Sequence, residues 1–278
     1  MEIKSNSAKV GWTAAIIVSL SSFIISLDNT FMNVAISNLV VDLNTTIPVV
    51  QIIISVYALT MASLMLFGSK MQDVVGKKTT FIYGAIIFGI GTVIATFSVN
   101  APMLLVGWSI LEGIGAALMT PATASIIIGS YGEDRSTFAM AIRTSFASAG
   151  AGFGPIIGGF LTTFFSWRWG FGLEFFIILI ILAFSSRLKT FPSNTNFSDL
   201  DIKGIIISSS GIFILVLGIL SLNTSTTLEI SSAIIGFGAL LLIIFYLREK
   251  VLMCGIKYQL LILNSLTTVT SLLEHFPG

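Results

Sequence analysis

The chain of 278 residues is apolar and carries few charges. Hydrophobic residues make up 55% of it, charged residues 10%, and the mean hydropathy is +0.98, whereas a soluble domain has about a quarter charged residues. The net charge of +1 gives no indication of a nucleic-acid partner. The only cysteine is Cys254 and the only histidine is His275, which excludes disulfide frameworks and metal sites built on these residue types. We expect no cofactor, no metal and no enzymatic activity.

Eight apolar segments of about 18–25 residues are each long enough to cross a hydrocarbon core of about 30 Å. They cover residues 11–36, 50–69, 79–98, 103–126, 138–163, 169–186, 204–222 and 230–247. The first follows a short polar start and lacks a small-residue cleavage site, so we expect a retained helix and not a signal peptide. The segments predict an all-α integral membrane protein with a helical bundle.

Basic residues alternate along the connections. They precede the first segment, occupy the second, fourth and sixth connections and follow the eighth segment, while the other connections hold only Arg168. By the positive-inside rule the N-terminus is cytoplasmic, and eight crossings return the chain to the cytoplasm. We therefore expect a multi-pass protein of the cell membrane.

The first segment contains an ionisable residue, Asp28, in the run LDNTFMNVAI at residues 27–36. It lies about 17 residues into a helix, or roughly 25 Å along its axis. A carboxylate at that depth is a candidate functional residue. Burying it is costly when it is charged and less costly when it has bound a proton, so proton binding and release would change its energy in the membrane strongly. The alternative is that Asp28 faces an aqueous vestibule or caps the helix.

The second connection reads SKMQDVVGKK at residues 69–78. Gly76 permits a tight turn between two helices, and Asp73 can accept hydrogen bonds from a helix N-terminus. The basic pair Lys77 and Lys78 follows. The alternative is a simple cytoplasmic loop, which explains the lysines but not the spacing of Asp73.

The fourth segment carries Glu112 near mid-membrane, in the run SILEGIGAA at residues 109–117. An unpaired anion there is costly, so we expect Glu112 to be protonated or paired. Arg143, some six residues into the fifth segment, is a candidate partner. We favour the alternative that Arg143 extends to the cytoplasmic interface.

The fifth segment contains the run GAGFGPIIGG at residues 150–159, which ends at Gly159. Gly150, Gly154 and Gly158 recur every fourth residue and form a smooth stripe against which another helix can pack closely in lipid. Pro155 removes a backbone donor and predicts a bend. The alternative is ordinary transmembrane packing.

The connection to the sixth segment reads SWRWGFGLE at residues 166–174. Two tryptophans beside Arg168 are typical of a membrane–water interface. Glu174 lies about five residues into its helix. It either lines a water-accessible cavity or is an interfacial acid near Arg168.

Taken in order, these runs resemble signatures of the major facilitator superfamily over approximately residues 8–250. Residues 27–36 resemble l-D-x-T-i-v-N-v-A-l-P of the fourteen-helix drug:proton antiporters. Residues 69–78 resemble G-x-L-x-D-R-x-G-R-K, and residues 150–159 resemble the antiporter motif g-x-x-x-G-P-x-x-G-G. Positions that depart from these patterns are Ser69 and Val74 in the cytoplasmic signature, Ser109 and Glu112 in place of arginine and glutamine, and Glu174 in place of asparagine.

The resemblance implies a six-helix N-terminal transporter half over residues 1–190, built from two inverted three-helix repeats. Two linker helices follow over 191–250, opened by a D-x-x-G pattern at Asp201, and a divergent tail covers 251–278. Asp28, Glu112, Glu174 and Arg143 are then candidates for proton coupling or substrate binding. In the family, the acid and basic pair of the 69–78 motif latch two transporter halves together.

The function so implied is proton-coupled efflux of lipophilic or cationic drug-like compounds by alternating access. Protons, a small substrate and the lipid bilayer are the expected partners. A fourteen-helix exporter needs roughly six further spans, so one alternative is a truncated, transport-inactive fragment or assembly partner that lacks a C-terminal half. Another is an exporter of a metabolite or sugar.

Overall fold

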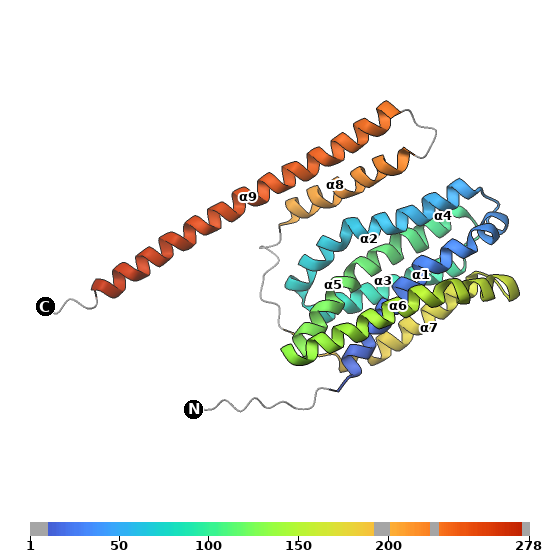
Figure 1. Ribbon diagram of the computed structural model, residues 1–278, viewed down its shortest axis with the longest axis horizontal. Helices are drawn as coiled ribbons and strands as arrows, with labels where there is room; N and C mark the ends of the chain where they lie inside the picture. The colour runs from blue at the N-terminus through green and yellow to red at the C-terminus, as the bar shows by residue number, and fades with distance from the viewer. Residues whose placement is uncertain (1–10, 192–200, 223–227, 274–278) are drawn as a thin grey trace. The chain divides into compact units, whose positions relative to one another are not determined.

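The computed structural model describes residues 11–191, 201–222 and 228–273, and every regular element within these ranges is helical (Figure 1). This confirms the predicted all-α class. The chain forms two compact units, residues 1–200 and 201–278, which are described separately.

The first unit is a bundle of long helices that run side by side (Figure 1). Short turns join most of them. Its elements are α1 Thr13–Asp42, α2 Ile47–Val75, α3 Lys77–Thr96, α4 Ala101–Leu104, η1 Leu105–Glu112, α5 Gly113–Ser130, α6 Glu133–Phe164, α7 Arg168–Phe184 and η2 Ser185–Arg187.

The fourth crossing is one continuous helical run over residues 101–130, in which η1 is a π-helix. The Asn100 side chain caps its start by accepting a hydrogen bond from the Met103 backbone N–H at 2.9 Å. In a π-helix each backbone bond spans five residues, so this stretch turns its side chains differently from an α-helix. Such segments are frequent at functional sites.

The helices of the first unit pair in a pattern with internal symmetry. The first crossing, α1, packs along the fifth, α6; the second, α2, along the fourth, α5; and the third, α3, along the sixth, α7. Exchanging crossings one to three with crossings four to six leaves these pairs unchanged. Two three-helix repeats would give such pairs, although α3 also packs against the fourth crossing, and the repeats stay a prediction.

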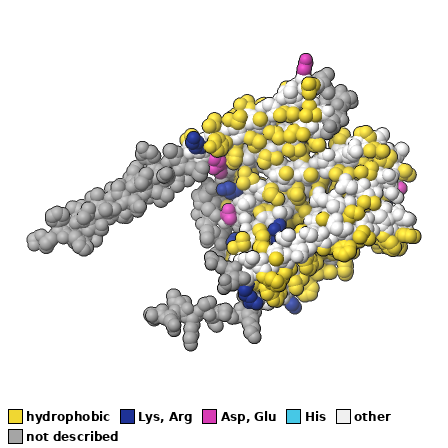
Figure 2. Space-filling view, viewed as in Figure 1, with side chains coloured by type: hydrophobic (Ala, Val, Ile, Leu, Met, Phe, Trp, Pro, Cys, Tyr) yellow, Lys and Arg dark blue, Asp and Glu magenta, His cyan; other side chains and the backbone are white. Residues whose placement is uncertain are grey.

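Not every long helix is equally apolar. Within the described residues, seven helical runs are long and apolar enough to cross a membrane, and α6 is not one of them. Its 32 residues are ample in length, since they would span about 48 Å. Glycine, serine and threonine lower its mean hydropathy. The fifth predicted crossing, residues 138–163, therefore stays a prediction. Figure 2 shows hydrophobic side chains over much of the visible face of the helices.

The glycine stripe of α6 lies against α1. A Cβ atom on Gly150 would collide with the Phe23 backbone oxygen. One on Gly154 would lie 3.0 Å from the Leu27 backbone oxygen, which is tighter than ordinary contact. The two backbones can approach this closely only because the stripe has no side chains. The helix α6 runs on as a single element through Pro155.

Two hydrophobic clusters form the core of the first unit. One surrounds residues 14–25 of α1 and includes Phe88. The other surrounds residues 27–43 of α1 and includes Trp108. Asp28 lies where the two clusters adjoin along α1, so its carboxylate is placed in the interior of the bundle.

The second unit contains α8 Ile202–Ser221 and α9 Leu228–Leu273, which pack against each other. Asp201 caps α8 by accepting a hydrogen bond from the Gly204 backbone N–H at 3.0 Å, so the predicted helix opening is confirmed. Arg248 of α9 donates to the same carboxylate at 2.6 Å and forms an ion pair with it. Chiefly because of this bond, the pKa of Asp201 is lowered to about 2.

The helix α9 extends well past the predicted eighth segment, which ended at residue 247. No proline occurs between residues 193 and 276, so nothing in this stretch forces the helix to stop. The side chains of residues 252–278, which hold most of the predicted tail together with Cys254 and His275, lie outside the described residues.

Candidate functional site

Asp28 is fully buried in the middle of α1. The Trp108 indole N–H donates to both oxygens of its carboxylate, at 2.7 and 2.8 Å. The alternative in which Asp28 faces a vestibule or caps the helix is therefore wrong: the residue is enclosed by the bundle, and α1 continues for 14 residues beyond it to Asp42.

The π-helix η1 holds Trp108 in place. The Tyr57 ring stacks on the Trp108 ring, with ring centroids 5.0 Å apart and planes 9° from parallel. One residue on, the Ser109 hydroxyl donates to the Ile53 backbone oxygen at 2.7 Å. The indole is thus fixed from α2 on one side, and its N–H is directed at the carboxylate of α1.

Three carboxylates meet in this interior. Asp28 of α1, Glu112 at the end of η1 and Glu174 of α7 each offer an oxygen, and these three atoms lie within 4.8 Å of one another. All three side chains are fully buried. Among the residues that the structure describes, none forms a hydrogen bond with an oxygen of Glu112 or Glu174. We refer to these three residues as the acid cluster.

The position of Glu174 overturns both interpretations made from the sequence. It is neither accessible to water nor an interfacial acid near Arg168. The helix α7 begins at Arg168, and six residues along it the chain has turned Glu174 toward the bundle interior. Counting residues from the start of a helix gives the depth of a side chain along the helix axis but not the side of the helix from which it projects.

Arg143 is not the partner of Glu112. Its Nε donates to the Ser22 hydroxyl of α1 at 3.1 Å, and the side chain is partly buried between α6 and α1. Within the described part of the chain, no ion pair joins the acid cluster to a basic side chain. The negative charge of the cluster must therefore be neutralised by bound protons or by a bound cation, because an uncompensated buried charge is very costly.

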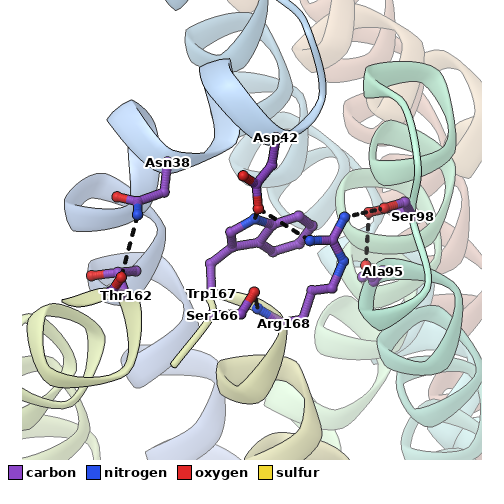
Figure 3. Close-up of polar contacts among 8 residues, drawn as sticks. All are labelled: Asn38, Asp42, Ala95, Ser98, Thr162, Ser166, Trp167 and Arg168. Atoms are coloured by element: carbon purple, nitrogen blue, oxygen red, sulfur yellow. Dashed lines mark hydrogen bonds and ion pairs between the residues drawn. The ribbon is translucent and has the colours of Figure 1, made fainter. Parts of the chain in front are cut away.

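A second polar network links the end of α1, the residues just past α3 and the start of α7 (Figure 3). Asp42, at the end of α1, accepts from the Trp167 indole N–H at 2.9 Å and pairs with Arg168 at 3.2 Å. The Arg168 guanidinium also donates to the Ser98 backbone oxygen, just past α3, at 2.8 Å. This network lies at the end that the charge pattern predicts to be extracellular.

The 69–78 motif lies at the other end of the bundle and away from the acid cluster. Gly76 has φ +92°, a left-handed value that favours glycine, and forms the tight turn predicted between α2 and α3. Lys78 donates to the Leu188 backbone oxygen at 3.0 Å, and Lys77 lies over the Phe191 ring. Asp73 is exposed at the end of α2.

The rest of the glycine motif also borders α1. A Cβ atom on Gly158 would lie 2.8 Å from the Phe31 ring, whereas one on Gly159 would make only ordinary contact with Val34. Pro155 is exposed. The stripe thus contacts the same helix that carries Asp28, although none of its residues joins the acid cluster.

Sequence reasoning missed Tyr57 and Trp108. A tryptophan in mid-span is itself a signal, because its N–H needs a partner in the hydrocarbon region. The two departures from the family pattern, Glu112 and Glu174, were each noted, but nothing in the sequence showed that they lie together.

Comparison with known proteins places the chain among membrane transporters. The family model described as Major Facilitator Superfamily matches residues 18–247. The methylenomycin A resistance protein of Bacillus subtilis (strain 168) is 32% identical over 167 residues, which is 60% of this chain and 36% of that protein. The methyl viologen resistance protein SmvA of Salmonella typhimurium (strain 14028s) is 30% identical over 177 residues, 63% of this chain and 36% of that protein.

The chain thus spans about a third of the length of these two relatives. Among solved structures, the crystal structure of the peptide transporter POT in complex with sulfate matches with a TM-score of 0.62 and 19% identity. That match covers 84% of this chain and 51% of the peptide transporter. At this identity the likeness concerns the fold alone.

Proposed function

The chain belongs to the major facilitator superfamily, and we propose that it is the N-terminal part of a proton-coupled exporter of lipophilic or cationic compounds. The observation that carries this proposal is the acid cluster, three fully buried carboxylates without a basic partner in the described part of the chain. Ionisable groups inside a membrane bundle are rare and mark ion or proton pathways. The family and the relatives named above point to transport and not to catalysis.

Proton coupling needs a group that alternates between charged and neutral forms. When Asp28 and its two neighbours bind protons, the bundle interior loses negative charge, and burying the three carboxyl groups becomes less costly. When the protons leave, the charge favours a state in which the carboxylates reach water. A two-state transporter can use this difference to bias one orientation against the other.

The glycine stripe and the 69–78 motif would take part in the conformational change of transport. The glycine stripe lets α6 pack closely against α1. Asp73, Gly76, Lys77 and Lys78 form the predicted cytoplasmic gating motif, in which Asp73 is exposed at the end of α2.

A cationic cargo is supported by two observations. The cluster concentrates negative charge beside the stacked rings of Tyr57 and Trp108, and aromatic faces attract cations. Methyl viologen, to which one relative confers resistance according to its name, is a dication. A lipophilic body would suit the apolar helices around the site.

A second candidate is an assembly partner that does not transport alone. It is favoured by the chain's match to only 36% of the length of each of the two relatives. In this case the two units would dock on another membrane protein that supplies the remaining helices of the transport path.

Accumulation of methyl viologen and of a fluorescent lipophilic cation tests the proposal. Cells that make the 278-residue chain, its Asp28→Asn variant, its Glu229→Gln variant or an empty vector are compared. Glu229 is an exposed acid and is the matched control. Export by the chain and by Glu229→Gln, lost in Asp28→Asn and on dissipating the proton gradient, supports the proposal.

Accumulation equal to that of the empty vector, in cells whose membranes contain the inserted chain, contradicts export by this chain alone and favours the assembly partner. Export that persists in Asp28→Asn contradicts the coupling role of that residue. In that case the same accumulation measurement would be made on Glu112→Gln and Glu174→Asn.

A further inference from the structure

We propose that the acid cluster of Asp28, Glu112 and Glu174 is a binding site for a divalent cation of the size of Ca²⁺. This site goes beyond the proposed export, because binding of the ion requires neither a cargo nor a proton gradient. The argument uses the spacing of the oxygens, the polar atoms left without partners, and the chemistry of the donor set.

The spacing fits one ion. Calcium binds oxygens at about 2.3–2.6 Å, so two oxygens on opposite sides of one ion are at most about 5 Å apart. The three oxygens of the acid cluster all lie within 4.8 Å of one another. Three oxygens 4.8 Å apart lie about 2.8 Å from their common centre, so a shift of a few tenths of an ångström in the side chains brings each within reach of a common ion, and three carboxylates can supply up to six oxygens if each binds through both.

An independent group points to the same place. The Tyr57 side chain is 1% exposed, and its hydroxyl makes no well-formed hydrogen bond. The hydroxyl lies within hydrogen-bonding reach of the Asp28 carboxylate. Buried polar groups in native proteins nearly always have a partner. Within the described residues, the oxygens of Glu112 and Glu174 have no hydrogen-bond partner, and the buried Tyr57 hydroxyl lies beside Asp28; one cation among these groups would satisfy them together.

The surroundings of the ligands are those of a supported site. Ligating carboxylates are usually held by further hydrogen bonds that fix their orientation. Trp108 does this for Asp28, since its N–H bridges both oxygens and is itself held by the ring of Tyr57. Each oxygen of Asp28 keeps a lone pair for a metal.

The donor set selects the class of ion. Only oxygens are present, which suits hard cations and not zinc or copper. Magnesium requires near-ideal octahedral geometry at about 2.0–2.1 Å and usually keeps several waters. The fully buried carboxylates, spread over 4.8 Å, fit the longer and more flexible bonds of calcium better. A divalent ion would also offset two of the three negative charges.

Terbium luminescence tests the site directly. Tb³⁺ replaces Ca²⁺ in oxygen sites and emits when a nearby tryptophan is excited, and Trp108 contacts one of the ligands. The purified 278-residue chain in nanodiscs, after equilibration, should show saturable emission that Ca²⁺ displaces. Glu112→Gln and Glu174→Asn should each weaken Tb³⁺ and Ca²⁺ binding by more than about tenfold. Asp42→Asn and Glu229→Gln should leave both unchanged.

A second measurement needs no variant. If Ca²⁺ binds only the folded chain, it raises the thermal unfolding temperature in proportion to the logarithm of its concentration. The absence of both saturable emission and a Ca²⁺-dependent shift would overturn the site. Equal affinity in Glu112→Gln, Glu174→Asn and the unmodified chain, or binding of Na⁺ with no binding of Ca²⁺, would also overturn it. These results are obtained without substrate, so they stand apart from the outcome of the export assay.

Discussion

Replacing Trp108 by phenylalanine tests whether the buried carboxylate of Asp28 is held by the indole N–H. The variant keeps an aromatic ring against Tyr57 but removes the donor that contacts both carboxylate oxygens. A hydrogen bond to a charged group contributes about 1.5–3 kcal/mol. For a domain of this size each kcal/mol corresponds to about 2–4 °C, so the unfolding temperature should fall by about 3–12 °C.

The assay is thermal unfolding of the purified chain in detergent, followed by circular dichroism. Trp169→Phe is the matched control, because Trp169 is 63% exposed and should change little. The Asp28→Leu background separates the hydrogen bond from lost packing, since Trp108→Phe then removes only packing. A fall in Trp108→Phe of less than about 1 °C, or an equal fall in the Asp28→Leu background, would refute the reasoning.

Three further predictions concern packing, pH and orientation. Gly154→Leu should lower the stability of the first unit by at least about 1–3 kcal/mol in thermal unfolding, because its side chain meets the backbone of α1, whereas Gly152→Leu, with open space around it, should not. The lowered pKa of Asp201 means that its ion pair contributes fully above the ordinary value of 3.8 and is lost as the pH falls to about 2. Asp201→Asn, which keeps the cap, should lack that pH dependence in the same assay; an unchanged profile would contradict the ion pair's role. A reporter active only outside the cytoplasm should give signal when fused after Asn100 and none after Lys78, and the reverse result would overturn the orientation.

Local chemistry in the sequence predicted the turns and caps well. Gly76 was expected to form a tight turn and has the positive φ that such a turn requires. The family resemblance implied that Asp201 opens a helix, and it caps α8. Both depend on a few neighbouring residues, so a single sequence carries the information. Several helices are longer than predicted, as for α2, which covers Ile47–Val75 and not 50–69. Hydropathy marks only the apolar stretch, and helices continue beyond it.

The meeting of the three carboxylates could not be predicted in the same way. Direction around a helix follows from regular α-helical geometry, and the π-helix η1 breaks that regularity just before Glu112. The direction of Glu174 depends on how α7 packs against α3 and α1, which involves residues far apart in the chain. The family resemblance showed which residues depart from the pattern, but the contact between them is a property of tertiary packing.

The composition of α6 has a consequence for how the protein enters the membrane. A helix that is not apolar enough by itself gains little from lipid and must gain from a protein neighbour. Its glycine stripe provides that neighbour in α1, which is made first and is already present when α6 leaves the ribosome. We therefore expect insertion of the predicted fifth crossing to depend on the first, so that the residues of α1 that face the stripe contribute to membrane insertion as well as to the folded bundle.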